Sequence, residues 1–305
     1  MKSTIKTVLS LSAVLSLSVS CLKEEIHSID NDLFDKYQHS FTICSAIDLR
    51  HYFSYNGSND IIICGHRGGS YSDYPENCLE TFDRLLYTGP IFFEVDPRIT
   101  KDEKIVLMHD ATLSRTTSLR GYVSDYTFEE LKSAFLVDVN GKKTTFHIPL
   151  LSDVIKWSQG RTILNFDQKD VPPKMICDLL SKMQAKNCIF TVHSVQEAKD
   201  ILLYDPEMCF SAFIGTVEKF HQYDSAGMLP HIVIAYLEST EVSDAELVSL
   251  LHSRGIRCMI STAPVENEPP SKIVCDYFVS MSPDIIESNY PANYMNNDKV
   301  RKNWL

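Results

Sequence analysis

After residue 58 the chain repeats one pattern, in which a short apolar run is followed by a polar break and often by an amphipathic stretch. The runs are rich in Ile, Val and Phe, as buried parallel strands are. The stretches NCLETFDRLLYT, KMICDLLSKMQ, SVQEAKDILLY and SDAELVSLLHSR are typical of helices. This alternation predicts an α/β fold. The nine candidate strands are DIIICG, IFFEVD, KIVLMHD, TILNFD, CIFTVHS, MCFSAFIG, HIVIAYLE, IRCMIST and CDYFVSM.

The number of candidate strands favours a (β/α)8 TIM barrel. One β–β connection is irregular, because only PRITKDE joins IFFEVD to KIVLMHD, and this is too short for a crossover helix. We expect an insertion after this third strand, residues 111–161, to cover one side of the barrel mouth, with TFEELKSAF as a helix. The alternative is a doubly wound open sheet, which the lack of a glycine-rich dinucleotide loop after the first strand disfavours.

The first 20 residues have the form of a secretory signal, with two lysines and an apolar, serine-rich core. Their ending, SVSC, resembles a bacterial lipoprotein cleavage site with Cys21 as the lipidated residue. An ordinary signal peptide is the alternative. The following LKEE resembles surface-export signals of some Bacteroidetes lipoproteins. We therefore expect an exported lipoprotein of the cell envelope, held at a membrane by its lipid anchor on the periplasmic or the outer side.

The chain is accordingly divided into a signal peptide (1–20), a polar lead-in (21–58) with a helix at DLFDKYQHSF, and a TIM-barrel domain (59–305). No stretch after the signal reaches the roughly 20 apolar residues that a membrane span needs. The sequence carries no signal for an oligomeric state.

The net charge of -11 argues against nucleic acid as a partner. It is compatible with an anionic small molecule, because a local cation or a bound metal can dominate a site. Apart from Cys21 there are eight cysteines, an even number that would allow disulfides in an exported protein. Several lie inside apolar runs and no CxxC pair occurs, so we expect mostly free, buried thiols and no zinc-type cluster.

Polar side chains collect where the first four candidate strands end. In a barrel, the carboxyl ends of the strands form one face, and that face carries the active site. Titratable groups that converge in this way mark a functional site. They are His66 after the first strand, Glu94 and Asp96 on the second, His109 and Asp110 after the third, and Asp167 and Lys169 on the fourth.

Glu94 and Asp96 are two residues apart on a strand, so both side chains point to the same face. Two carboxylates this close repel each other unless a cation joins them. A hard divalent cation held by oxygens, Mg²⁺ or Ca²⁺, would do so. The alternative is an ion pair with Arg67, Arg98 or Lys169.

The blocks HRGG, PEN, EVDPRITKDEKIVLMHDATLSRTT and IPLLSDVI resemble the glycerophosphodiester phosphodiesterases, most densely over residues 61–170. The resemblance implies a TIM barrel that hydrolyses small glycerophosphodiesters to sn-glycerol 3-phosphate and an alcohol, with one divalent cation. It also implies a role for each matching residue. His66 and His109 would be the general acid/base pair, Arg67 and Lys169 would hold the phosphate, Glu94, Asp96 and Asp167 would bind the metal, and Glu76 and Asn77 would support the site.

The chain departs from the family pattern at four places. Six residues separate Gly68 from Pro75, about one more than usual in the family, so the first loop is slightly longer. Asp167 stands where the family has Glu, CMISTAP lacks the family's tryptophan, and Ser288-Asn289-Tyr290-Pro291 replaces Thr-Asp-x-Pro. We expect the last two to lie away from the metal core and to affect specificity rather than chemistry. His147 and His193 are expected in surface or structural roles, and Trp157 in packing.

Two other functions are compatible with these residues. One is a phospholipase D-like or phosphoinositide-cleaving phosphodiesterase, which would need an apolar membrane-binding rim. The other is a non-catalytic surface lipoprotein that binds glycerophosphoryl groups. The presence of both His66 and His109 argues against the second, because binding alone does not need an acid/base pair.

Overall fold

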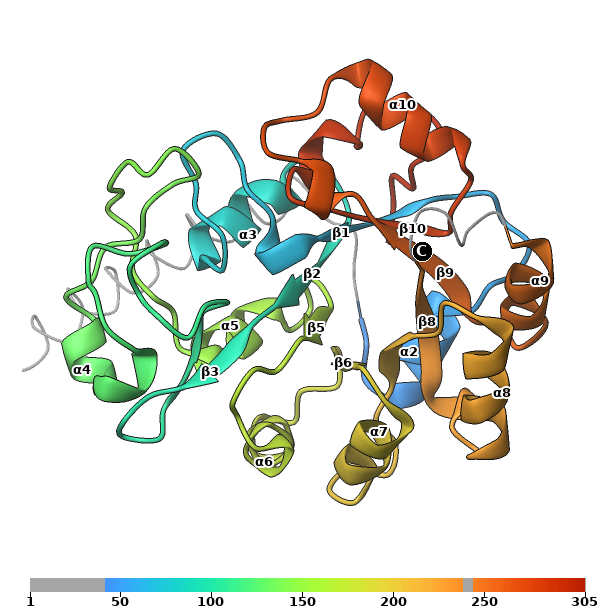
Figure 1. Cartoon of the computed structure of the whole chain (residues 1–305), viewed down its shortest axis with the longest axis horizontal. Coiled ribbons are helices and arrows are strands. Elements are labelled where there is room, and N and C mark those ends of the chain that lie inside the picture. The colour runs from blue at the N-terminus through green and yellow to red at the C-terminus, as the bar shows by residue number, and fades with distance from the viewer. Residues whose placement is uncertain (1–41, 238–243, 305) are drawn as a thin grey trace, which may run out of the picture. The chain divides into compact units, whose positions relative to one another are not determined.

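The computed structural model describes residues 42–237 and 244–304. Eight parallel strands close a barrel in the order β1-β10-β9-β8-β7-β6-β5-β2 (Figure 1). This confirms the TIM barrel. The barrel strands are β1 (Ile62–Gly65), β2 (Ile91–Val95), β5 (Leu164–Phe166), β6 (Cys188–Val192), β7 (Phe210–Phe213), β8 (Ile232–Leu237), β9 (Arg257–Ser261) and β10 (Ile285–Ser288).

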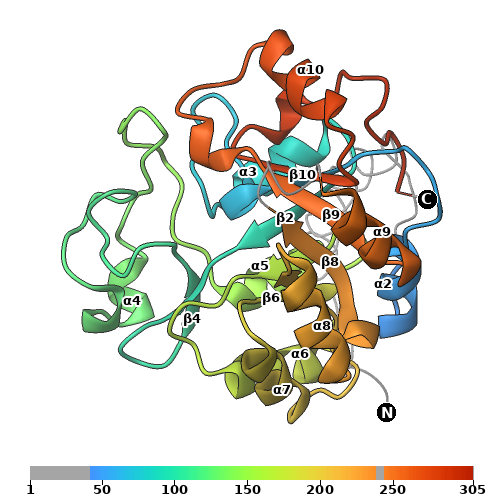
Figure 2. The same ribbon diagram turned by 45° about the vertical axis from the view of Figure 1, so that its right-hand side comes forward.

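Helices follow most of these strands and surround the barrel (Figures 1 and 2). The predicted helical stretches form α3, α6, α7 and α9, as expected from their apolar spacing. The helices of the barrel layer are α3 (Leu79–Leu86), α5 (Leu151–Ser158), α6 (Pro173–Met183), α7 (Val195–Leu202), α8 (Val217–Ser225), α9 (Ala245–Ser253) and α10 (Lys272–Ser280), with short 3-10 turns η1 (His66–Gly68), η3 (Leu229–His231), η5 (Ala263–Val265) and η6 (Pro291–Asn293).

The lead-in contains a helix, α2 (Ala46–Phe53). Ser45 is its N-cap residue, and the Ser45 hydroxyl accepts a hydrogen bond from the Asp48 amide. Its buried residues belong to the same apolar cluster as side chains of the barrel interior, such as Ile62 and Ile285. The lead-in therefore contributes a helix to the barrel core. The signal peptide, Cys21 and DLFDKYQHSF lie outside the described residues. No helix in the described ranges has the length and apolar character of a membrane span.

The irregular connection is confirmed. β3 (Pro97–Ile99) and β4 (Ile105–Leu107) pair antiparallel in a separate two-stranded sheet, so KIVLMHD is not a barrel strand. The insertion that follows contains η2 (Val123–Asp125) and α4 (Phe128–Leu131), a single turn where TFEELKSAF was expected to be helical. Figures 1 and 2 both show α4 beside the barrel, away from α8 and α9. The insertion and β4 share a separate apolar cluster, which includes Val106, Leu113, Leu131 and Leu136.

One predicted strand is wrong. CDYFVSM lies in α10, because Cys275, Phe278 and Val279 recur at helical spacing and bury one helix face. The barrel strand missing from the sequence analysis is β10, whose apolar part is only Ile285 and Ile286 before two polar residues that are also buried.

The remaining expectations about the core are confirmed for the described residues. Their eight cysteines are free, and all but Cys44 are buried. Trp157 packs near Phe82 and Phe93. His147 is structural, since its Nδ1 lies 2.7 Å from the carbonyl of Ala134.

Candidate active site

Three carboxylates meet at the carboxyl end of the barrel. Glu94 is on β2, Asp96 directly follows β2, and Asp167 directly follows β5, which is the neighbour of β2. One oxygen of each carboxylate lies within 4.8 Å of one of each of the other two. The structure thus brings together the three residues that were predicted as metal ligands.

The cluster carries more negative than positive charge. Glu94 is 5% exposed, and burial together with the charges of Asp96 and Glu287 raises its pKa well above the ordinary value. The Lys169 ammonium lies 2.8 Å from Asp96 Oδ1 and 2.5 Å from Asp167 Oδ2. Lys169 is therefore paired with two of the acids, as the alternative to a metal had allowed. Within residues 42–237 and 244–304, the Glu94 carboxylate accepts a single hydrogen bond, from the Arg67 backbone amide at 2.6 Å.

These residues fit a hard divalent cation. All three side chains offer oxygens, and their negative charges exceed what one ammonium can neutralise. A bound cation would oppose the burial and the repulsion that raise the pKa of Glu94. Asn77 holds the cluster in place: its Nδ2 donates to Asp96 Oδ2 at 2.6 Å, and its Oδ1 accepts from the Asp96 amide at 3.2 Å.

His66 and Arg67 are placed by the turn η1 that ends β1. Arg67 has a φ of 53°, in the left-handed region. Gly68 has a φ of +77°, and a Cβ atom there would lie 1.8 Å from Phe82 Cε1, so the backbone conformation and the packing both favour glycine at this position. The turn therefore packs directly on α3.

His109 reaches the site by an unexpected route. It follows β4, which is antiparallel to β3 and outside the barrel, and the hairpin returns it to the mouth, where the Met108 amide donates to the Asp96 carbonyl. Its Nε2 lies 3.0 Å from Arg67 Nη2 and its Nδ1 lies 2.8 Å from Asp110 Oδ1. Arg98 fixes this end of the hairpin, since its Nη2 donates to the His109 carbonyl at 2.7 Å.

Arg115 was missed by the sequence analysis, although it lies in the block DATLSRTT. It comes from the insertion and bridges Glu76 and Asp110, with four nitrogen–oxygen contacts between 2.7 and 3.0 Å. Although burial opposes ionisation of Glu76, Arg115 lowers the pKa of that carboxyl. The hydrogen bond from Arg115, with help from His109, also holds the pKa of Asp110 far below its usual range. Glu76 thus supports the site through Arg115, and its Oε2 lies 3.6 Å from Arg67 Nη1.

Two residues predicted to lie away from the chemistry are part of the site. His193, at the end of β6, places Nε2 3.2 Å from Asp167 Oδ1, and this hydrogen bond raises the pKa of His193. Burial opposes ionisation of Asp167, but His193 and Lys169 lower its pKa. Asn289, at the end of β10, places Oδ1 2.8 Å from His66 Nδ1. The Ser288–Pro291 segment was expected to affect specificity, and the structure adds a contact with His66, because the turn after the last strand is adjacent to the turn after the first.

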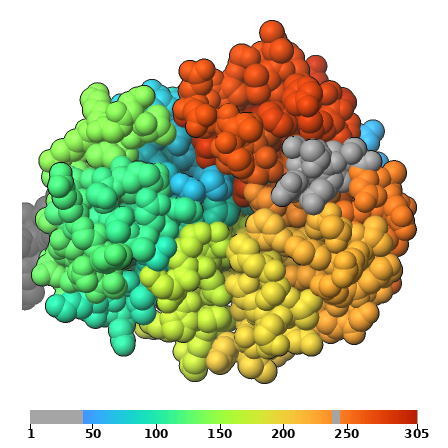
Figure 3. All heavy atoms as spheres, viewed as in Figure 1, coloured from blue at the N-terminus to red at the C-terminus, as the bar shows by residue number. Residues whose placement is uncertain are grey.

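Glu287 is a further buried acid that the sequence analysis missed. It accepts a hydrogen bond from the Tyr236 hydroxyl at 2.7 Å and adds to the negative charge near Glu94. In the space-filling view, the blue segment after β1 lies recessed between the green, yellow and orange-red parts of the chain (Figure 3). The contacts of Arg67 with Glu94 and His109, together with the cluster of three carboxylates, place the predicted site residues at one face of the barrel.

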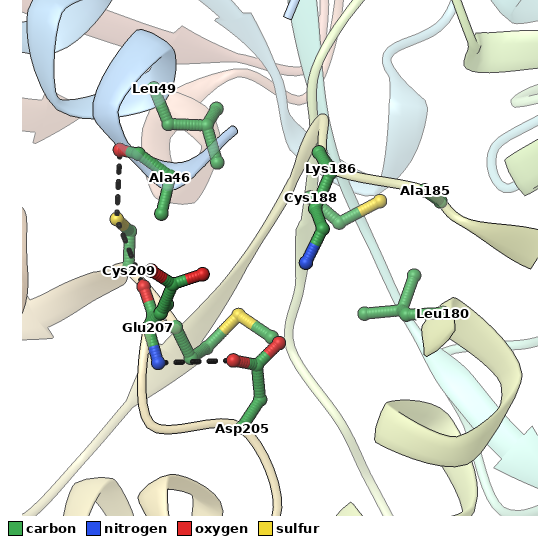
Figure 4. Close-up of a pocket in the computed structure, with 10 residues that line it drawn as sticks. Ala46, Leu49, Leu180, Ala185, Lys186, Cys188, Asp205, Glu207 and Cys209 are labelled. Carbon is green, nitrogen blue, oxygen red and sulfur yellow. Dashed lines mark hydrogen bonds between the residues drawn. The ribbon is translucent and has the colours of Figure 1, made fainter. Parts of the chain in front are cut away.

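The amino end of the barrel holds a different pocket, between α2 and the starts of β6 and β7 (Figure 4). Its lining is mostly apolar, and Cys209 Sγ donates weakly to the Ala46 carbonyl at 3.9 Å. The polar side chains that line it are Lys186, Asp205 and Glu207. None of the lining residues is a histidine. It does not resemble a site for phosphodiester chemistry.

The fold agrees with comparisons to known proteins. The sequence profile described as "Glycerophosphoryl diester phosphodiesterase family" matches residues 66–224. The chain belongs to this family. A glycerophosphodiester phosphodiesterase of Bacillus altitudinis is 27% identical over 224 residues, which cover 70% of this chain and 82% of that protein.

Solved structures support the same assignment. A glycerophosphoryl diester phosphodiesterase from Parabacteroides distasonis is 38% identical, with a TM-score of 0.78 and coverage of 84% of this chain and 92% of that one. A phosphodiesterase from Oleispira antarctica, 16% identical with a TM-score of 0.61, shares the fold over 80% of this chain and 97% of its own. The protein is thus a phosphoric diester hydrolase of the glycerophosphoryl diester phosphodiesterase family, which generally uses a divalent metal.

Proposed function

We propose that the enzyme hydrolyses glycerophosphodiesters to sn-glycerol 3-phosphate and an alcohol, with Mg²⁺ or Ca²⁺ and with His66 and His109 as the acid/base pair. The observation that carries the proposal is Arg67: its guanidinium contacts His109 and its amide binds Glu94. Imidazole, guanidinium and carboxylate cluster are therefore within reach of one small phosphodiester. The Oleispira antarctica phosphodiesterase was solved in complex with the product sn-glycerol-3-phosphate.

The reaction needs positive charge where the phosphoryl oxygens lie. Glu94, Asp96 and Asp167 would hold the cation, which when bound neutralises phosphate charge as a Lewis acid. Arg67 would donate to a phosphate oxygen, because its guanidinium lies between His109 and Glu76 at the mouth. Lys169 would add positive charge beside Asp96 and Asp167.

The proton transfers would use the two imidazoles. In each ring Nδ1 is bound to a side-chain oxygen, of Asn289 for His66 and of Asp110 for His109. Nε2 is then the nitrogen that would face the reactants, without a hydrogen-bond partner among the described residues in His66 and beside Arg67 Nη2 in His109. One histidine would take a proton from the attacking oxygen and the other would give one to the leaving alcohol.

We further propose that the enzyme works at the cell envelope, anchored through Cys21. The support is the sequence SVSC and the lead-in after it. Metabolic labelling with a palmitate analogue tests this: the wild type should be labelled and Cys21→Ser should not. Labelling of the Cys21→Ser variant, or none of the wild type, would contradict the proposal.

The reaction is tested by release of glycerol 3-phosphate from glycerophosphocholine and glycerophosphoethanolamine. Release should stop with EDTA and return with Mg²⁺ or Ca²⁺. His66→Ala and His109→Ala should each lower turnover by about 100-fold or more. His147→Ala is the matched control, since that ring contacts the Ala134 carbonyl and not the site. Folded protein with no release from either substrate under any metal would reject the proposal. Release from lysophospholipids or phosphoinositides instead would favour the lipid-cleaving alternative, and phosphodiester binding without release the non-catalytic one.

A further inference from the structure

We propose that Asn289 is a positioning residue that fixes the tautomer of His66, and that buried Glu266 holds Asn289 in place for this task. The inference deepens the proposed function, because it concerns the imidazole to which that function gives a proton transfer. The motif containing Asn289 was expected to affect specificity only. Its contact with His66 joins residues 223 positions apart in the chain.

The orientation of the Asn289 amide follows from its partners. Its Nδ2 lies 3.0 Å from the Ala263 carbonyl and 3.2 Å from the Glu266 carbonyl. Carbonyl oxygens only accept, so the NH₂ group must face them. The Oδ1 atom therefore faces His66 Nδ1, at 2.8 Å.

An amide oxygen also only accepts, so the hydrogen of this contact belongs to His66 Nδ1. In the neutral ring, Nε2 then carries the lone pair. In the described part of the chain, no hydrogen bond involves His66 Nε2. Asn289 thus leaves that nitrogen free to exchange a proton with a reactant.

Glu266 makes this arrangement rigid. It follows η5 and is 6% exposed. Its carboxylate accepts from the backbone amide of Asn289 at 2.8 Å and from the Ser288 hydroxyl at 2.8 and 3.0 Å. The hydroxyls of Thr262 and Tyr294 donate to the same carboxylate, at 2.9 and 3.0 Å. Because several donors hold this carboxylate, it fixes the backbone at Asn289. The direction of the Asn289 side-chain amide is thereby fixed as well.

The partner of His66 differs in kind from the partner of His109. Asp110 is an anion shared with Arg115, whereas Asn289 is a neutral amide locked by two backbone carbonyls. A neutral acceptor fixes the ring and its tautomer without adding the charge that an aspartate would bring. The Asn in the Ser288-Asn289-Tyr290-Pro291 segment therefore gives His66 a neutral hydrogen-bond acceptor.

The first measurement is the ring ¹⁵N shifts of histidine in the whole protein labelled with [¹⁵N]histidine, with the His66 signals assigned by their loss in His66→Gln. The wild type should show the tautomer protonated at Nδ1. Asn289→Ala should lose this signature and lower kcat by about 10- to 100-fold with KM changed little. Asn289→Asp keeps an acceptor and should restore the Nδ1–H signature.

Asn293→Ala is the control, because Asn293 also donates its amide to a backbone carbonyl, that of Pro270 at 3.0 Å. It should change neither the spectrum nor kcat. A wild-type His66 protonated at Nε2, or an unchanged His66 signature in folded Asn289→Ala, would overturn the proposal. The spectra need no substrate, so they decide the tautomer even if glycerophosphodiesters are not turned over. If Asn289→Ala does not fold, the wild-type spectrum still decides the outcome.

Discussion

Two clusters of metal-ligand residue types lie at opposite ends of the barrel. At the carboxyl end are Glu94, Asp96 and Asp167, and at the amino end His252, Cys258 and Asp284. Both have ligand atoms within 4.8 Å of one another. In the second cluster Asp284 Oδ2 accepts from His252 Nε2 at 2.8 Å and from the Cys258 amide at 2.7 Å.

The two clusters differ in charge balance. The His252 ring also stacks on Tyr55 at 3.5 Å, and burial raises the pKa of the Cys258 thiol, so the group at the amino end is satisfied without a cation. At the carboxyl end, the Lys169 ammonium pairs with Asp96 and Asp167 but not with Glu94, whose pKa is raised by burial and by the neighbouring acids. Unbalanced buried charge, rather than the residue types alone, therefore distinguishes a candidate metal site from a structural one.

The largest expected difference between the clusters is in turnover. Glu94→Gln removes the negative charge of one expected metal ligand. Turnover should fall by about 100-fold or more, because a weakly bound metal would no longer stabilise the charge on the phosphoryl oxygens. His252→Ala at the other end should keep turnover near that of the wild type. Both variants are compared by initial rates with saturating Mg²⁺. Equal losses in the two variants would remove the functional distinction between the clusters.

Metal binding should stabilise the protein through the carboxyl end alone. A cation at about 100 times its Kd would add about 2.7 kcal/mol to the free energy of unfolding. Thermal melts with EDTA, Mg²⁺ or Ca²⁺ should show this shift in the wild type and in His252→Ala, and a much smaller one in Asp167→Asn. A metal shift that survives in Asp167→Asn but disappears in His252→Ala would reverse the assignment.

The stability of the metal-free enzyme should fall as pH rises. The folded-state pKa of Glu94 is raised, so its neutral form is stable in the fold, and stability is lost as pH climbs from the ordinary value of 4.5 through the raised one. Asp167 acts in a separate window, because its lowered pKa costs stability only as pH falls below 3.8. Urea unfolding in EDTA from about pH 5 to pH 8 should show the fall in the wild type and a flatter profile in Glu94→Gln. Parallel profiles would contradict the role given to Glu94.

The smallest effect concerns folding at the amino end. His252→Ala removes a hydrogen bond to a carboxylate that is 7% exposed and should cost about 1 to 3 kcal/mol of unfolding free energy. Chemical denaturation measures it. Exposed His221, on α8, is the matched control, since its replacement by Ala should change stability by less than about 0.5 kcal/mol. No loss in His252→Ala would mean that the Asp284 contact is not structural.

The predictable parts of the molecule are those that one segment of chain determines. Buried strands show their apolar runs, and Glu94 with Asp96 shows the alternation of a strand. CDYFVSM was misassigned because Val, Tyr and Phe suit a strand as well as a buried helix face. The short β10 was missed for the opposite reason, since half of it is polar.

The unpredicted parts of the site depend on partners that are distant in sequence. His193 meets Asp167 across neighbouring strands, and Asn289 meets His66 only because β10 pairs with β1. Arg115 enters from the insertion, which no periodic pattern describes. A sequence motif gives residue types and spacing, whereas these contacts follow from barrel closure.

Barrel closure also sets the order of events when the protein is made. β1 pairs with β2 on one side and with β10 on the other, so one edge of the first strand waits for one of the last segments to leave the ribosome. A nascent chain that ends before residue 285 would contain the three carboxylates and both histidines, yet His66 would lack Asn289 and the barrel would stay open. The protein is therefore expected to become active only after the final strand has docked. An incomplete chain is expected to remain inactive.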